Sequence, residues 1–138
     1  MVDDDAAIRK IGQLSLSKVG KWQVIMAESG AQGLELAIAE NPDVILLDVM
    51  MHGMDGPTTF QRMKDCRELA SKLVIFMTAK VQSHEVENYI RLGALGVIKK
   101  PFDPMTLPRE IEGILQNHPD STVSMHAQPG TNPSIYER

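Results

Sequence analysis

The residues of this sequence that could perform chemistry are acidic, hydroxyl and basic side chains that follow apolar segments. They are Asp3, Asp4, Asp5, Asp48, Thr78 and Lys100. A carboxylate can attack phosphorus and form an acyl phosphate. Further carboxylates beside it would repel it unless a cation lay among them, and Mg²⁺ favours oxygen ligands of this kind. A lysine and a hydroxyl could bind the remaining phosphoryl oxygens. Together these residue types indicate magnesium-assisted phosphoryl transfer.

Such chemistry requires a fold that brings these residues to one place. The segments Val44–Asp48 and Leu73–Met77 are nearly continuous apolar runs, which are typical of strands buried on both faces of a parallel sheet. Shorter strands are predicted at Val24–Met26 and Val97–Ile98, and one more ends at the first three aspartates. In such a sheet, ligands bind outside the carboxyl ends of the strands, which is where the candidate residues stand.

Segments with helical periodicity separate the predicted strands. Their apolar stripes are predicted at Ile8, Ile11 and Leu14; Ala31, Leu34 and Ile38; Phe60, Met63 and Cys66; Val86 and Ile90; and Leu107, Ile111, Ile114 and Leu115. Ser29 and Gln32 have the spacing of a capping box, and Asp103 with Pro104 marks the predicted start of the last helix. Strand–helix alternation repeated about five times predicts an α/β fold, with a parallel sheet, helices on both faces and right-handed crossovers.

Length and composition fit one domain. The chain has 138 residues, of which 43% are apolar, and both values are ordinary for a single globular domain. The periodic patterns stop after His118, so residues 1–118 are predicted as the domain and residues 119–138 as a tail or linker. The formal net charge of −4 gives no electrostatic reason to expect nucleic-acid binding. A single cysteine, no bilayer-spanning apolar run and no signal-peptide pattern favour a cytoplasmic protein.

Each candidate residue, taken alone, also fits an ordinary structural role. An aspartate after a strand often caps the next helix, and this is the expected role of Asp5. Thr78 alone would be an ordinary strand-end residue, and a lysine such as Lys100 usually reaches solvent. The joint arrangement is what favours a phosphoryl-transfer site.

Five short motifs resemble those of the receiver domain of two-component response regulators. They are Val2-Asp-Asp4, Val44-Ile-Leu-Leu-Asp48, Met54-Asp-Gly56, Phe76-Met-Thr-Ala79 and Lys100-Pro-Phe102. The spacing of the aspartates, the threonine and the lysine also resembles that of the family, and the likeness runs from about Val2 to His118. Single-domain chemotaxis regulators are the nearest simple likeness. The resemblance implies a doubly wound, five-stranded, flavodoxin-like parallel sheet with strand order 2-1-3-4-5.

The resemblance implies a role for each candidate residue. Asp48 would be the phospho-acceptor, Thr78 the switch hydroxyl and Lys100 the lysine that contacts the phosphoryl group. The magnesium ligands would be Asp3, Asp4, Asp48 and the backbone carbonyl of Met50. Within the acidic pair, Asp4 would be the more direct ligand. The Lys100–Pro101 peptide bond is expected to be cis.

The resemblance also implies partners. The phosphodonor would be a sensor histidine kinase or a phosphotransfer protein, with small phosphodonors as an alternative. The signal would leave through a phosphorylation-dependent conformational change and partner binding, so the chain would not be an enzyme with an output of its own. No membrane partner is expected. A stand-alone regulator, a receiver cut from a larger regulator and a homodimer all fit the sequence.

Two other functions share part of the pattern. A pseudo-receiver that is never phosphorylated would act only as an interaction module, although the intact Asp4, Asp48, Thr78 and Lys100 favour phosphorylation. A phosphatase of the haloacid dehalogenase type also uses an aspartyl phosphate and magnesium. That family has a second aspartate two residues after its nucleophile, where this sequence has Met50. Hydrolysis of added phosphate monoesters would favour the phosphatase.

Three features depart from the family's pattern. Val97 stands where the family usually has Tyr or Phe, so the aromatic part of its switch is missing. His52 stands where proline is common, and it is expected to be an exposed loop residue close enough to the site to affect phosphate lifetime. Only Met1 and Val2 precede Asp3, so the first strand is predicted to be truncated. Strand exchange with another chain could fill the resulting gap.

Overall fold

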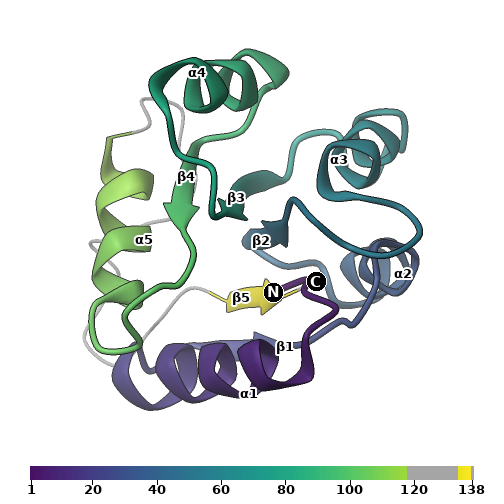
Figure 1. The fold of residues 1–138 in the computed structure, drawn as a ribbon. Helices are drawn as coiled ribbons and strands as arrows, with labels where there is room; N and C mark the ends of the chain where they lie inside the picture. The colour runs from purple at the N-terminus through teal and green to yellow at the C-terminus, as the bar shows by residue number, and fades with distance from the viewer. Residues whose placement is uncertain (118–133, 138) are drawn as a thin grey trace.

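The computed structural model describes residues 1–117 and 134–137, which form a parallel sheet with helices on both faces (Figure 1). The strands are β1 (Gln23–Ile25), β2 (Val44–Asp48), β3 (Leu73–Thr78), β4 (Gly96–Lys99) and β5 (Ser134–Glu137). The helices are α1 (Ala6–Leu14), continued by the π-helical turn η1 (Ser15–Val19), α2 (Gly30–Glu40), α3 (Gly56–Lys64), α4 (Ser83–Leu92) and α5 (Leu107–Gln116). The predicted α/β class with a parallel sheet is confirmed.

The predicted order 2-1-3-4-5 placed the amino-terminal strand between the strands that are labelled β1 and β2 here. The observed order is β1-β5-β2-β3-β4, so β5 occupies that central position instead. The predicted first strand is reduced to Val2, which bridges Ala27 on one side and Leu47 on the other. The Val2 N–H donates to the Leu46 carbonyl at 2.7 Å, and the Val2 carbonyl accepts from the Asp48 N–H at 2.9 Å. The space for one strand between β1 and β2 is called the central lane here. The amino-terminal segment fills only the carboxyl end of this central lane.

Strand β5 fills the rest of that lane, although it lies within the range predicted as a tail or linker. Its register pairs it with Gln23–Ile25 on one side and with Val44–Leu46 on the other. An empty interior lane would leave backbone groups of both neighbouring strands without partners, so an extended segment gains hydrogen bonds on two sides by entering it. The gap is thus filled by the chain itself, and Figure 1 shows its two ends side by side there. Residues 118–133 and 138 of the predicted boundary and tail lie outside the described residues.

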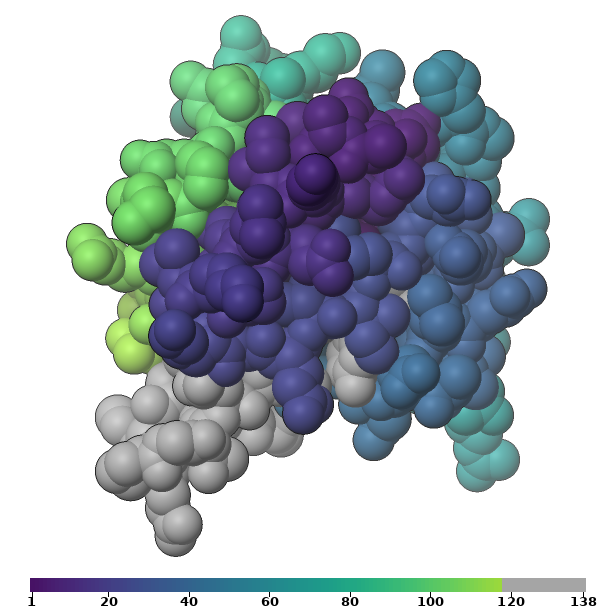
Figure 2. Space-filling model, turned by 90° about the horizontal axis from the view of Figure 1, so that it is seen from below, coloured from purple at the N-terminus to yellow at the C-terminus, as the bar shows by residue number. Residues whose placement is uncertain are grey.

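Alternate strand residues enter two apolar cores, one on each face of the sheet. In β2, for example, Leu46 packs with Ile111 of α5, whereas Leu47 packs with Phe60 of α3. All five residues of β2 are buried, which explains its continuous apolar sequence. Figure 2 shows α1 and η1 covering one side of the molecule beside α5.

Helix ends mostly follow local signals. The Asp5 side chain caps α1, and Ser29 caps α2 by accepting the Gln32 N–H. The predicted start of the last helix is wrong: Asp103 caps a separate turn, and α5 begins at Leu107. Within the described part of the chain, no helix is long and apolar enough to cross a membrane.

Three predicted helix faces are partly wrong. Ile11 and Leu14 of α1 were expected to face the core but are 41% and 51% exposed. Ile38 of α2 is 50% exposed and Ile90 of α4 is 44% exposed. In α4, Tyr89 packs against the core instead. No residue of α4 is fully buried, whereas each of the other described α-helices has at least one buried residue.

Candidate functional site

The predicted site residues lie at the carboxyl edge of the sheet. Asp48 is the last residue of β2, Thr78 is the last residue of β3, and Lys100 directly follows β4. Asp3 and Asp4 follow the bridge that ties the amino-terminal segment to β2. The parallel topology therefore brings all five residues to one edge, as the sequence predicts.

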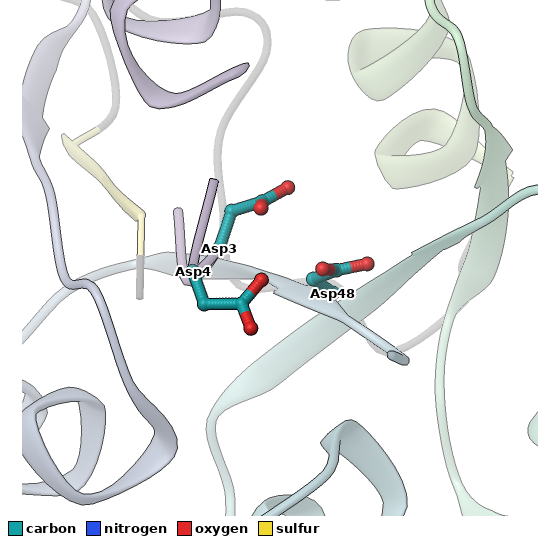
Figure 3. Close-up of side chains that lie close together, drawn as sticks. All are labelled: Asp3, Asp4 and Asp48. Carbon is teal, nitrogen blue, oxygen red and sulfur yellow. The ribbon is translucent and has the colours of Figure 1, made fainter. Parts of the chain in front are cut away.

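Asp3, Asp4 and Asp48 form a compact cluster of carboxylates. Each offers one oxygen, and these three oxygens lie within 4.8 Å of one another. Figure 3 shows Asp3 and Asp4 beside the Asp48 carboxylate at the end of β2. Asp3 and Asp48 are 0% and 2% exposed, whereas Asp4 is half-buried. The cluster is thus mostly removed from water but open on the Asp4 side.

Lys100 balances part of this negative charge. Its Nζ atom lies 2.9 Å from Asp3 Oδ2 and 3.2 Å from Asp48 Oδ1. Burial lowers the pKa of Lys100, but the hydrogen bond and charge of Asp3, together with those of Asp48, outweigh burial and raise it. Lys100 is therefore a permanent cation at neutral pH. The Lys100–Pro101 peptide bond is cis, as predicted.

The Asp48 carboxyl is harder to ionise than an ordinary aspartate. Burial is the main cause and the charge of Asp3 adds to it, while Lys100 acts in the opposite direction. Together these effects raise the pKa of Asp48 to about 6. At neutral pH the group is mainly a carboxylate, which is the nucleophilic form, but its ionisation lowers the stability of the fold.

This pKa predicts how the stability of the metal-free protein depends on pH. The pKa of Asp48 is about 6 in the folded protein, against an ordinary value of 3.8, so the folded state binds the proton more tightly. The resulting stabilisation is complete below pH 3.8 and is lost as the pH rises through 6. In EDTA, the free energy of unfolding should fall by about 1–2 kcal/mol more in the wild type than in Asp48→Asn between about pH 5 and 8. Urea titrations at both pH values measure this difference, and identical pH dependences would contradict it.

Asp4 is held by His52, a contact that sequence reasoning missed. The backbone N–H and the ring Nδ1 of His52 lie 2.9 and 2.8 Å from Asp4 Oδ2. The backbone hydrogen bond from His52 is the main reason why the pKa of Asp4 is lowered. The imidazole is otherwise exposed, as predicted. The contact depends on the path of the loop after β2, for which the sequence carries no periodic signal.

A close approach between α3 and β2 closes this loop. Asp55 caps α3 by accepting the Thr58 N–H at 2.8 Å. A Cβ atom on Gly56 would lie 2.4 Å from the Asp48 carbonyl oxygen, so a side chain at this position would push the helix away. The Met54-Asp-Gly56 motif therefore fixes the start of α3 against the strand that carries the central carboxylate.

Thr78 and Met50 stand at the margin of the cluster. The buried Thr78 hydroxyl accepts the Lys80 N–H at 3.1 Å, which leaves its own proton for another acceptor. Met50 is 70% exposed on the loop after β2. The predicted role of the Met50 carbonyl as a metal ligand stays a prediction.

The donors in the cluster fit a divalent cation that prefers oxygen ligands. Three carboxylates face one ammonium group, so negative charge remains uncompensated. The charge of Asp3 accordingly adds to burial in raising the pKa of Asp48. Mg²⁺ commonly binds through one or two carboxylates and keeps several waters. Asp3 accepts the Asp5 N–H with one oxygen and Lys100 with the other. Asp4 and Asp48 are therefore the more available direct ligands.

The chain is similar to known regulators over most of its length. The family model of the response regulator receiver domain matches residues 1–112. The probable transcriptional regulator ycf27 of Guillardia theta is 33% identical over 126 residues, which cover 91% of this chain and 48% of that protein. The transcriptional regulatory protein CseB of Streptomyces coelicolor is 36% identical over 115 residues, which cover 83% and 47% of the two chains. The chain spans about half the length of these curated relatives.

A solved structure supports the same assignment. The chemotaxis response regulator CheY4 of Vibrio cholerae matches with a TM-score of 0.75 and 27% identity, over 83% of this chain and 94% of that chain. The match to the family model also includes every one of the predicted site residues, from Asp3 to Lys100. The chain therefore belongs to the response regulator receiver domain family of two-component systems.

Proposed function

We propose that this receiver accepts a phosphoryl group on Asp48 in a magnesium-dependent reaction. The observation that carries the proposal is the position of the Asp48 carboxylate, which is buried 3.2 Å from Lys100 Nζ and within one cluster with Asp3 and Asp4. A carboxylate in this setting can be ionised at neutral pH, has a fixed cation beside it and has neighbouring oxygens that can hold a metal ion. These are the requirements of an aspartyl-phosphate acceptor.

The residues of the chain divide the work of the transfer. One Asp48 carboxylate oxygen bonds to phosphorus as the bond from phosphorus to the donor breaks, and the electron pair leaves with the donor. Lys100 is positioned to balance the charge that the phosphoryl group brings, and Thr78 can donate its proton to a phosphoryl oxygen. When bound by Asp4, Asp48 and the Met50 carbonyl, with Asp3 in support, Mg²⁺ would neutralise charge on the phosphoryl oxygens.

The donor and the output follow from membership of the family. Receiver domains of response regulators work with histidine kinases or phosphotransfer proteins, and one of these is the proposed donor. The proposed output is a change of conformation that alters partner binding, without catalysis on an external substrate. The curated relatives are named as transcriptional regulators. The proposed downstream use is therefore the control of a segment that regulates transcription.

Intact-mass spectrometry tests the proposal. Wild type and Asp48→Asn are incubated with acetyl phosphate, each with Mg²⁺ and with EDTA. We expect one phosphoryl adduct on the wild type with Mg²⁺ and none in the other three samples, because the variant's amide is not a nucleophilic carboxylate and EDTA removes the metal. The Asp65→Asn variant is a matched control, since Asp65 lies at the far end of α3, and it should form the adduct normally. An adduct on Asp48→Asn, or an equal adduct in EDTA, would contradict the proposal, and no adduct in any sample would favour the pseudo-receiver.

A further inference from the structure

Arg9 of α1 lies beside the acidic cluster and contacts its backbone. The Nη1 atom of Arg9 donates to the Asp3 carbonyl at 2.8 Å, while its Nη2 atom lies 3.8 Å from Glu28 Oε2. The Arg9 side chain is 19% exposed, whereas that of Glu28 is 69% exposed. Burying a charge is unfavourable unless the group is hydrogen-bonded. The contact with the Asp3 carbonyl therefore holds the guanidinium here, and Glu28 is a distant, solvated partner.

This contact continues the anchoring of the amino-terminal segment beyond the sheet. The Val2 N–H and carbonyl pair with β2, and the Asp3 N–H donates to the Ala27 carbonyl at 3.1 Å. The next main-chain polar group is the Asp3 carbonyl, which accepts from Arg9. Shortly afterwards the chain turns into α1, which begins at Ala6. A guanidinium on the helix thus continues what main-chain hydrogen bonds begin.

Holding the Asp3 carbonyl fixes the directions of two carboxylates. The carbonyl belongs to the peptide unit that joins Asp3 to Asp4. This unit is planar and includes both Cα atoms, so a rotation of the plane would displace both side chains. The Asp3 carboxylate contacts Lys100 in the interior, and the Asp4 carboxylate contacts His52 at the open side of the cluster. Arg9 therefore holds the peptide that connects the buried part of the cluster to its open part.

The charge of Arg9 and its positioning effect would act in opposite directions on a bound cation. A guanidinium beside a cation site repels the ion, so its removal would tighten cation binding if charge were its main effect. A residue that orients metal ligands has the reverse effect, since loss of such a partner typically weakens metal binding by about 10–100-fold. Glu28 carries the opposite charge 3.8 Å from Arg9, which reduces the repulsion. The positioning effect should therefore exceed that of charge.

We propose that Arg9 is a positioning residue for the divalent cation, and that it acts by fixing the peptide unit between Asp3 and Asp4. The inference rests on the proposed function, because it needs a cation at the cluster of Asp3, Asp4 and Asp48. It gives α1 a part in the site, although this helix carries none of the carboxylates, the hydroxyl or the lysine of the site.

Electron paramagnetic resonance of Mn²⁺ tests the inference, since the sharp signal of the free ion is lost on binding. Mn²⁺ favours the same carboxylate, carbonyl and water ligands as Mg²⁺. The full chain is titrated with Mn²⁺ at one pH, and competition by Mg²⁺ and the Asp4→Asn variant show whether the ion binds at the cluster. We expect the Kd for Mn²⁺ to rise on the order of 10-fold in Arg9→Met. Arg9→Lys keeps the charge on a shorter stem without the planar fork, so it should raise the Kd by a smaller factor.

Two control variants separate the carbonyl contact from the effect of charge. Lys10→Met removes a cation from an exposed position on the same helix and should not raise the Kd. Glu28→Gln removes the charge of the distant partner and leaves the contact between Arg9 and Asp3 in place, so its Kd should stay within about 2-fold of the wild-type value. Circular dichroism shows whether each sample is folded, and if Arg9→Met does not fold, Arg9→Lys decides alone.

The outcomes separate this inference from the proposed function. An unchanged or lower Kd in folded Arg9→Met, or in Arg9→Lys where it decides alone, would overturn the role of Arg9 and leave the proposed function standing. An equal rise in Glu28→Gln would also overturn it, because the ion pair would then matter more than the carbonyl contact. The absence of Mn²⁺ binding to the wild type would count against a magnesium-dependent function and, with it, against this inference.

Discussion

Removal of residues 134–138 is expected to destabilise the protein by about 5 kcal/mol or more, because it empties an interior lane of the sheet. Strand β5 pairs with three residues of β1 and with three residues of β2. Each buried backbone group left without a partner costs about 1–3 kcal/mol. The loss is therefore comparable to the whole stability of an ordinary domain. Urea unfolding followed by circular dichroism measures it.

Point variants separate the strand from the length of the chain. Ile135→Pro should reproduce most of the loss, since proline removes a backbone donor and is excluded from central strands. Ile135→Val is the matched control, because it keeps the donor and a β-branched side chain, and it should leave the unfolding midpoint close to that of the wild type. If the shortened chain and Ile135→Pro unfold at the same urea concentration as the wild type, β5 does not belong to the sheet.

Replacement of Lys100 by methionine should have the next largest effect, on both stability and phosphorylation. The Lys100 ammonium is the cation that contacts the buried Asp3 and Asp48 carboxylates. Removing one partner of a buried ion pair costs about 3–5 kcal/mol, because the remaining charge is left uncompensated. In EDTA at about pH 8 we expect a loss of this size in the free energy of unfolding, and saturating Mg²⁺ should restore part of it.

The same variant should form the acetyl-phosphate adduct on the order of 10²-fold more slowly, since it lacks the fixed charge beside the acceptor. Lys99→Met is the matched control, because Lys99 is the neighbouring lysine on β4 and its side chain is exposed. Equal losses in both variants would show that general surface charge, rather than the contact with Asp3 and Asp48, matters here. The rates come from intact-mass spectra taken over time.

The parts of the fold predicted correctly are those with a strong local signal. The continuous apolar runs of β2 and β3 predicted buried parallel strands, and the residues that close them, Asp48 and Thr78, were predicted to lie at one edge of the sheet. The short segment Ser134–Glu137 has no comparable signal. It becomes a strand because the lane between β1 and β2 needs a partner, and that need is visible only once the sheet is assembled.

The site shows the same division between local and tertiary information. The three aspartates and Lys100 were predicted to converge, and they do. The contact between His52 and Asp4 depends on how one loop turns, which residue types do not determine. The valine at position 97 suggested that an aromatic contribution was missing. In α4 the residue that faces the core is Tyr89, whose ring packs against Phe76, and not the predicted Ile90, because the phase of a short amphipathic helix is poorly fixed by two apolar residues.

Because two separate segments share the central lane, the two ends of the chain lie where they could be joined covalently. Strand β5 and the Val2 bridge run in the same direction between the same two neighbours, and Figure 1 shows the arrow of β5 pointing toward the amino terminus. Glu137 pairs with Leu46 and Val2 bridges Leu47, the next residue of β2, so a peptide that links the two ends would loop out of the sheet and leave both pairings in place. Circular permutation or backbone cyclisation at this seam should therefore preserve the architecture, with new ends opened in an exposed loop elsewhere.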